Sequence, residues 1–254
     1  MFRILLTLLI LAAPAMAQEK VVAGLSQNRV AITANFDGTG ILIFGAVKRE
    51  SPPPEGGPLQ VVIAVAGPSK AVTVRRKERI LGIWVNHDAI EVDAAPSFYA
   101  VASTAPLDTV LSQTEDLRYK VSINNMIRNV GEAGKASEKA EVFTDAVIRI
   151  RHNNGLYSQS GGIVELADET LFNTQIALPS NLVEGDYLAR IFLTRDQKVV
   201  DEYETTITVR KVGLERWIYN LAHERPLIYG ILSLTIAILA GWLASAVFRI
   251  LRLN

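Results

Sequence analysis

The sequence predicts a mainly β fold with an α-helical insertion, in an exported domain followed by one C-terminal transmembrane helix. Three observations indicate this class. Short apolar segments separated by turn residues occupy both halves of the chain, apolar residues at helical spacing occupy its middle, and an uncharged apolar run lies near its end. We therefore expect an immunoglobulin-like, β-sandwich-rich domain attached to a membrane.

Residues 18–105 form the first β-rich half. Alternating apolar residues at 30–36, a turn at 37–40 and an apolar run at 41–47 indicate strands. The proline-rich segment 51–58 is expected to be an exposed loop, because proline cannot donate to a strand ladder. Further short strands are expected at 59–66, 71–74, 80–85 and 98–102.

Residues 106–155 change to helical spacing, and residues 156–212 return to strands. The apolar periodicity predicts a helical hairpin, with helices at about 113–130 and 136–153, and Gly155 is placed to end the second helix. The later turn at 184–187, followed by alternating apolar residues, resembles one seen in immunoglobulin-like modules. That likeness concerns structure and indicates no activity.

The uncharged run at 226–248 predicts a transmembrane helix. Its 23 residues would span about 34 Å as a helix, enough to cross a hydrocarbon core of about 30 Å. Residues 213–225 before it form an amphipathic juxtamembrane segment, in which Trp217 and Tyr219 are candidates for the membrane interface. The alternative is that this segment packs on the domain itself. Residues 249–254 are expected to form a cytoplasmic tail.

The N-terminus predicts a secretory signal peptide, residues 1–17. Arg3 precedes an apolar stretch at 4–13, and Ala15-Met16-Ala17 offers a cleavage site after Ala17. An uncleaved second anchor is the alternative. Both versions place the domain on the periplasmic side of the inner membrane and the C-terminus in the cytoplasm, because Arg3, Arg249 and Arg252 favour the inner side.

Composition excludes several classes of chemistry. The chain has no cysteine, which excludes disulfides, thiolate metal ligands and covalent haem attachment. Of 26 Lys and Arg residues, 23 remain in the exported part after Arg3, Arg249 and Arg252 are removed, against 26 Asp and Glu. That balance does not suggest nucleic acid as a partner. We expect no cofactor.

Catalytic and metal-binding motifs are missing from the sequence. The three histidines, His87, His152 and His223, lack the spacing of metal ligands. The sequence contains no G-x-S-x-G nucleophile motif and no phosphate-binding glycine loop. We therefore expect a protein that is not an enzyme, with a metal-dependent enzyme built on His87 or His152 as the less favoured alternative.

Two residue clusters are candidate binding features. The basic cluster Arg75, Arg76, Lys77 and Arg79 suggests an anion-binding patch, for lipid headgroups or a small anionic solute, or else a solvated turn between two strands. Within the transmembrane run, small residues recur every fourth position and suggest a helix-packing face. These helix-packing candidates are Ser233, Ala237, Gly241 and Ser245.

Several stretches of the sequence are distinctive when they are taken together. They are the segments at 41–46, 82–86, 96–101, 155–157, 171–172, 185–187, 213–216, 229–230 and 241–242, with Pro179. In these stretches the chain resembles an alphaproteobacterial family of transmembrane proteins of unknown function. Members of this family are often encoded beside a multi-span exporter of the sulfite or organosulfonate type. The resemblance implies an accessory role beside a transporter, and it supplies no catalytic residues.

The expected function is therefore a membrane-anchored, periplasmic, non-catalytic accessory protein. Its expected partners are the lipid bilayer and an integral membrane protein such as an anion or sulfite exporter, or a second copy of the chain. The alternative is a periplasmic domain that binds or senses a small anion. A purely structural role in the envelope is the remaining alternative.

Overall fold

The computed structural model describes residues 19–33, 35–50, 52, 56–127 and 135–251. The predicted signal peptide, residues 1–17, lies outside them, as do the last three residues of the predicted tail. The chain divides into two compact units. One contains most of the strands and the first four helices, and the other consists of Ala31–Phe36 with the chain from Arg210 onward.

Among the described residues, the first unit contains two large sheets and a long two-stranded hairpin of β5 (Ser69–Ile80) and β6 (Ile83–Pro96). One has four strands in the order β1 (Lys20–Leu25), β3 (Gly38–Lys48), β10 (Leu171–Pro179) and β9 (Glu165–Ala167), all antiparallel. The other has six, in the order β2 (Arg29–Ile32), β12 (Lys198–Lys211), β11 (Gly185–Arg195), β4 (Gln60–Ala66), β7 (Tyr99–Ser103) and β8 (Tyr157–Gly161). Strand β2 and the end of β12 reach into the second unit.

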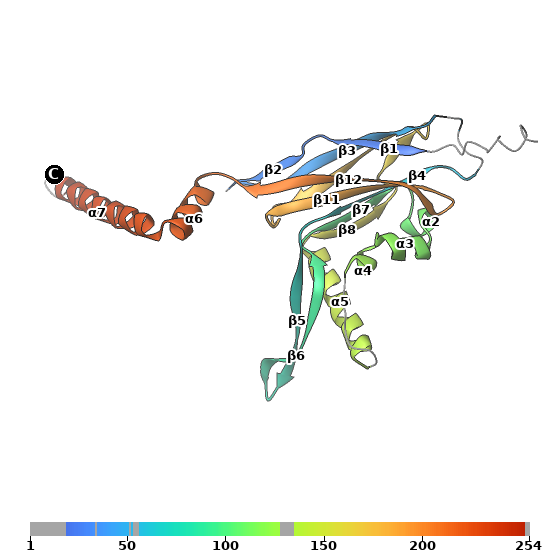
Figure 1. Ribbon diagram of the computed structural model, residues 1–254. Coiled ribbons are helices and arrows are strands. Elements are labelled where there is room, and N and C mark those ends of the chain that lie inside the picture. The colour runs from blue at the N-terminus through green and yellow to red at the C-terminus, as the bar shows by residue number, and fades with distance from the viewer. Residues whose placement is uncertain (1–18, 34, 51, 53–55, 128–134, 252–254) are drawn as a thin grey trace, which may run out of the picture. The chain divides into compact units, whose positions relative to one another are not determined.

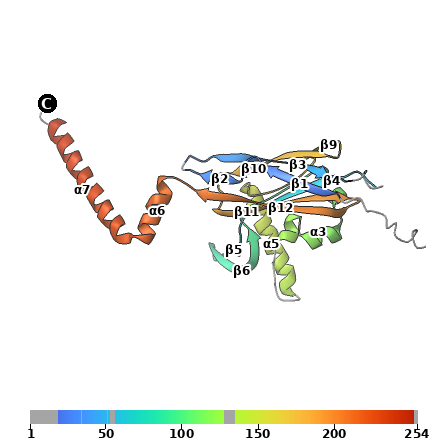
Figure 2. The same cartoon turned by 45° about the horizontal axis from the view of Figure 1, so that its top comes forward.

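The six-stranded sheet is covered on both faces, and Figure 2 shows these layers. The four-stranded sheet lies on one side, and its strand β10 alternates between exposed and buried residues, with Phe172 and Ile176 buried. Helices and the base of the long hairpin cover the other side, where Val62, Tyr99 and Phe192 belong to a shared apolar core. Strands β4 and β7 are therefore buried along nearly their whole length.

The helical insertion connects β7 to β8, which pair in parallel. It contains α2 (Leu107–Val110), α3 (Gln113–Tyr119), α4 (Ile123–Met126) and α5 (Lys135–Asn153). Parallel neighbours need such a crossover, because a tight turn cannot return the chain to the same end of the sheet. The predicted second helix, 136–153, is confirmed in α5.

The predicted first helix, 113–130, is wrong, because the chain breaks after Tyr119. Lys120 takes a left-handed conformation with φ of 51°. The Asp116 carboxylate accepts hydrogen bonds from the backbone N–H groups of Val121 and Ser122, at 3.1 and 2.7 Å, and the Ser122 side chain then caps α4. These local polar bonds compete with helix continuation. Residues 128–130 of the predicted helix lie outside the described chain.

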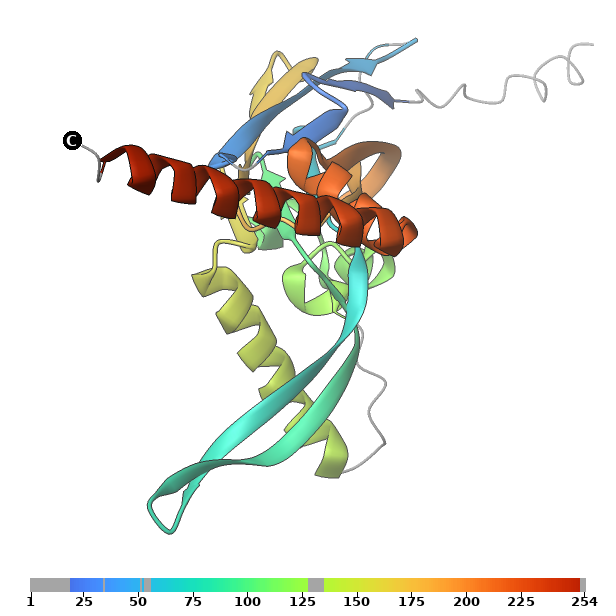
Figure 3. The same ribbon diagram turned by 90° about the vertical axis from the view of Figure 1, so that its left-hand side faces the viewer.

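A second correction concerns residues 69–96. Strands β5 (Ser69–Ile80) and β6 (Ile83–Pro96) form one long two-stranded hairpin, instead of the short strands predicted at 71–74 and 80–85. Its outer part stands away from both sheets (Figures 1 and 3). Both faces of this outer part are exposed, so its sequence lacks the alternation that marks a half-buried strand.

The second unit contains two helices, α6 (Leu214–Glu224) and α7 (Pro226–Leu251). Pro226 begins α7, where its missing N–H is tolerated and its fixed φ suits the first helical turn. The predicted fold class, mainly β with a helical insertion and one C-terminal apolar helix, is thereby confirmed.

The immunoglobulin-like strand order is not confirmed. One feature of such modules is present, since the Tyr187 hydroxyl donates to the backbone carbonyl of Val183 at 2.8 Å, as in a tyrosine corner. The parallel β7–β8 pair and its helical crossover are additions to a purely antiparallel sandwich.

Candidate functional site

The basic cluster predicted between two strands lies within strand β5. Arg75, Arg76, Lys77 and Arg79 are all exposed, and the turn comes later, at Leu81 and Gly82. The interpretation of residues 75–79 as a solvated turn is therefore wrong. Their side chains are nevertheless exposed to solvent, as that interpretation predicted. Strand β5, which carries these four cations, pairs with β6 through its backbone. Backbone pairing does not require a buried side-chain face.

The four cations do not form a single patch. Successive residues of a strand point to opposite faces, so Arg76 faces away from Arg75 and Lys77. Arg76 pairs with Asp88 directly across the ribbon at 2.5 Å, and His87 lies 3.6 Å from Glu78. His87 is the extra residue of a β-bulge, because Arg76 is opposite Asp88 while Lys77 is opposite Asn86.

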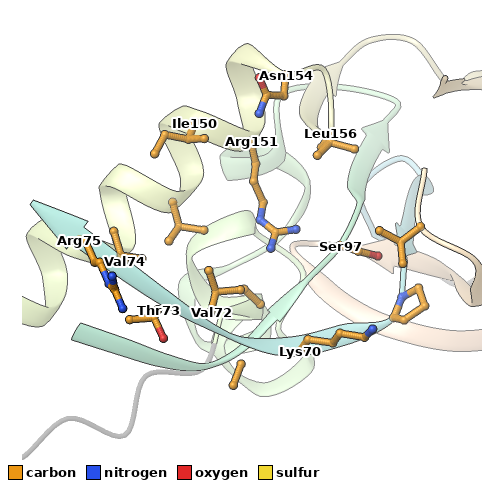
Figure 4. A pocket seen from close by; sticks show the side chains of 15 residues that line it. Lys70, Val72, Thr73, Val74, Arg75, Ser97, Ile150, Arg151, Asn154 and Leu156 are labelled. Atoms are coloured by element: carbon orange, nitrogen blue, oxygen red, sulfur yellow. The ribbon is translucent and has the colours of Figure 1, made fainter. Parts of the chain in front are cut away.

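A groove of about 600 Å³ lies at the base of the hairpin, against the C-terminal half of α5 (Figure 4). Its walls are largely aliphatic, with Val72, Val147 and Leu156 among them. Three cations line it, Lys70, Arg75 and Arg151, and none of the described lining residues is an aspartate or glutamate. The lining therefore offers apolar contact and positive charge together, which suits a small organic anion.

Arg151 is held in place inside this groove. Its Nη1 donates to the backbone carbonyl of Pro96 at 2.7 Å, and its guanidinium lies 5.5 Å from the centre of the Tyr157 ring. The Tyr157 hydroxyl donates to the same carbonyl at 2.7 Å, and burial raises the pKa of Tyr157 to about 12. This tyrosine is therefore a neutral hydrogen-bond donor at physiological pH.

Sequence reasoning missed Arg151 as a candidate. Its position in the last turn of α5 fits the helix dipole, which gives an arginine there an ordinary explanation. Only Arg75 of the predicted cluster lines the groove. The signal that was available is weak, namely an arginine beside Val147 and Ile150 on an otherwise apolar face of the helix.

A buried ionic cluster joins the ends of the four-stranded and six-stranded sheets. The Glu19 side chain is 0% exposed and accepts from Arg195 Nη2 at 3.0 Å and from Arg49 Nε at 2.7 Å. Glu169 completes the cluster at 3.4 Å from Arg195 and 3.6 Å from Arg49. Each buried charge has an opposite partner, so removing one of them would leave an uncompensated charge in the interior.

The three histidines lie on three different elements. His87 is on β6, His152 is at the end of α5, and His223 is in α6, where its ring stacks on Tyr219 at 4.0 Å between centroids. Within the described ranges, no group of three or more His, Asp or Glu side chains is placed to hold a metal ion. The metal-dependent alternative gains no support from these positions.

Helix α7 includes a segment, Pro226–Arg249, that is long and apolar enough to cross a membrane, with a mean hydropathy of 2.2 and no buried residues. At 3.6 residues per turn, its small residues gather in an arc of about 140°. The small residues of this arc, called here the small-residue face, are Gly230, Ser233, Ala237, Ala240, Gly241, Ala244 and Ser245, and Leu234 and Phe248 lie within the same arc. Ala246 lies on the opposite side, and a Cβ added to Gly241 would meet no other atom.

Trp217 and Tyr219 lie in α6, directly before the spanning helix. Both side chains are exposed, at 55% and 62%. A headgroup-level position for them stays a prediction, and the exposure is compatible with it.

Comparison with known families gives one match. Residues 20–250 match the family described as "Putative transmembrane protein (Alph_Pro_TM)". A search of curated proteins finds no match. The matched range covers the sheets, the helical insertion, the hairpin and the spanning helix. The chain therefore belongs to this alphaproteobacterial transmembrane protein family.

Proposed function

We propose that the protein is a non-catalytic accessory protein, anchored by α7 with its β domain in the periplasm, that binds an integral membrane protein through this helix. The small-residue face of α7 carries the proposal. Lipid gives helices no hydrophobic reason to associate, so close backbone approach at Gly, Ala and Ser supplies the packing energy. The charged residue Arg249 after the apolar run supports a cytoplasmic C-terminus.

The small-residue face gives a matched pair of substitutions. Ala237→Leu adds a bulky side chain on the face, and Ala246→Leu adds the same side chain on the opposite side. We expect Ala237→Leu to weaken the complex about tenfold or more, because the larger side chain prevents the close approach of the two helix backbones. Ala246→Leu should leave it intact. Co-purification of the full-length protein in mild detergent measures both.

A photo-crosslinking amino acid scanned along α7 separates the possible partners. Crosslinks concentrated at positions 233, 237 and 241, to a larger membrane protein, support the accessory role. Crosslinks to a second copy of the chain would show self-association instead. Yields that are even around the helix would contradict the proposal, because a packed face must protect one side.

The groove at the hairpin base supports a second candidate function, binding of a small organic anion. Three cations, an aliphatic wall and no described lining carboxylate favour an anionic group attached to a short apolar body. Calorimetry on the full-length protein in nanodiscs, with sulfite, sulfate and short-chain sulfonates, tests it. We expect the organic sulfonates to bind more tightly than the inorganic anions.

Arg151→Met should weaken that binding by about tenfold, the usual effect of losing one charged hydrogen bond. Arg149→Met is the matched control, because Arg149 is exposed on the same helix and does not line the groove. Lys70→Gln gives a second test that leaves the Arg151–Pro96 bond intact. No binding of any of these anions at millimolar concentration would exclude this candidate.

A further inference from the structure

The tip of the β5–β6 hairpin exposes a continuous run of large apolar side chains. Leu81 is 99% exposed, Trp84 68%, Ile83 65%, Ile80 43% and Val85 38%. Scattered exposed apolar residues are ordinary, but five within six consecutive positions form a patch that marks an interaction site. The tip stands away from both sheets (Figures 1 and 3), and its apolar side chains are exposed among the residues that the structure describes.

The backbone conformation of the turn residues also indicates a functional role for the tip. Leu81 and Gly82 form a two-residue turn in which both have positive φ, 50° and 87°. Glycine suits such a turn, and asparagine or aspartate would suit the first position, whereas a bulky leucine is strained there. A leucine that is strained and fully exposed contributes nothing to the stability of the isolated domain. Strain of this kind occurs at functional positions.

Apolar side chains occupy both faces of the ribbon at the tip. Ile80 pairs with Ile83 on one face, and Trp84 pairs with Arg79 on the other. A ribbon that docks sideways on a protein would need only one apolar face. A ribbon that enters an apolar medium end-on needs both.

A basic band lies directly behind the tip. Residues 75–88 carry four cations, Arg75, Arg76, Lys77 and Arg79, against two acids, Glu78 and Asp88. All four cations are exposed, and Asp88 already pairs with Arg76. From tip to base the order is apolar at Ile80, Leu81 and Ile83, and then cationic from Arg79 to Arg75, with Arg79 directly opposite Trp84 at the boundary. This order matches acyl chains and anionic headgroups at a bilayer surface.

We propose that the hairpin tip inserts end-on into the interfacial layer of an anionic phospholipid bilayer. Ile80, Leu81, Ile83 and Trp84 enter the acyl boundary, and the basic band contacts the phosphates. Trp84 suits this depth because its indole has an apolar body and a polar N–H. The same chain carries a spanning helix, which keeps the domain at a bilayer. This contact is independent of whether α7 binds a partner.

Trp84 reports the insertion directly. The chain has three tryptophans, so a full-length protein with Trp217→Phe and Trp242→Phe retains Trp84 alone. This protein is reconstituted into nanodiscs of phosphatidylglycerol and phosphatidylcholine, with and without acyl-chain-brominated lipid. We expect blue-shifted Trp84 emission and quenching by the brominated lipid, with both weaker in pure phosphatidylcholine.

Leu81→Asn is the decisive variant, because asparagine suits the left-handed turn position and preserves the hairpin. It should reduce the ratio of inserted to free tip by about tenfold, the loss expected for one leucine side chain leaving an apolar medium. Leu117→Asn is the matched control, since Leu117 is 66% exposed on α3 and outside the hairpin. Quenching should be unchanged by that substitution.

Two results would overturn the proposal. One is Trp84 emission typical of a water-exposed indole, unquenched by brominated lipid in anionic nanodiscs, which would leave a protein partner as the occupant of the tip. The other is quenching that Leu81→Asn does not reduce, which would mean that the anchor alone brings Trp84 near the lipid. Replacement of Arg75, Lys77 and Arg79 by glutamine should remove the preference for phosphatidylglycerol, and a retained preference would contradict the role of the basic band.

Discussion

Arg195→Met is expected to lower the free energy of unfolding by about 3–5 kcal/mol, the usual effect of removing one partner from a buried ion pair. The Arg195 side chain is 9% exposed and contacts Glu19, which is 0% exposed, at 3.0 Å. Removing it leaves the Glu19 carboxylate buried with Arg49 as its remaining close cation. Denaturant unfolding of the full-length protein, followed by far-UV circular dichroism, measures the loss. Tryptophan fluorescence is unsuitable, because Trp84, Trp217 and Trp242 all lie outside the two sheets.

Lys48→Met is the matched control for Arg195→Met. Lys48 and Glu50 form an ion pair at 3.3 Å with side chains that are 63% and 81% exposed. Loss of such a pair should change stability by less than about 1 kcal/mol. Equal effects of the two substitutions would contradict the importance of burial. The double variant Glu19→Gln, Arg195→Met should lower the free energy of unfolding by less than the sum of the two single substitutions, since it removes the unpaired charge.

The same cluster predicts a pH dependence. Burial alone would raise the pKa of Glu19, but the hydrogen bonds and positive charges of Arg195 and Arg49 outweigh it and hold this pKa below its ordinary value of 4.5. The stabilisation is therefore fully present above the unfolded pKa and is lost as the pH falls through the lower folded value. Arg195→Met should flatten this acid limb of the stability profile, as measured by unfolding at a series of pH values.

Phe192→Ala is expected to lower the free energy of unfolding by about 3–5 kcal/mol, the range for truncating a fully buried aromatic side chain. Phe192 is 0% exposed in the centre of the six-stranded sheet. Its ring lies 5.6 Å from that of Tyr119 at 64°, and the Arg190 guanidinium lies 5.3 Å from its centre. Phe192 therefore connects the sheet to the helical insertion. The substitution should weaken both, with hydrogen exchange in α3 rising along with the loss of global stability.

Phe44→Ala makes the comparison for Phe192→Ala, because Phe44 lies on β3 with 45% of its surface exposed. We expect it to cost about 1 kcal/mol, as only part of its area leaves water on folding. A cost for Phe192→Ala that is no greater than this would mean that the helical insertion packs loosely on the sheet.

Periodicity predicted the elements that bury one face or cross an apolar medium. The apolar spacing of α5 and the uncharged length of α7 are local patterns, and both appear as expected. The break after Tyr119 was missed because it depends on where one side chain, Asp116, directs its hydrogen bonds. The long hairpin was missed because both of its outer faces are exposed, which removes the alternation on which strand prediction depends.

The candidate sites divide in the same way. The basic residues, the spanning helix and its small-residue stripe follow from the order of residues alone, because charge and hydropathy are local properties. The groove required α5 and the hairpin base to meet, which brings Arg151 beside Lys70 and Arg75 from distant parts of the chain. The apolar tip required the turn to form at Leu81 and Gly82 instead of at residues 75–79.

The membrane anchor, the β-rich class and the helical insertion follow from the order of residues alone, because each depends on spacing within one segment. Which side chains remain exposed depends on the tertiary structure. Leu81 and Leu59 are both leucines, yet the Leu81 side chain is 99% exposed and that of Leu59 is 1% exposed. Burial is set by what the rest of the chain places over a segment, and nothing in the first unit is placed over the hairpin tip among the residues that the structure describes.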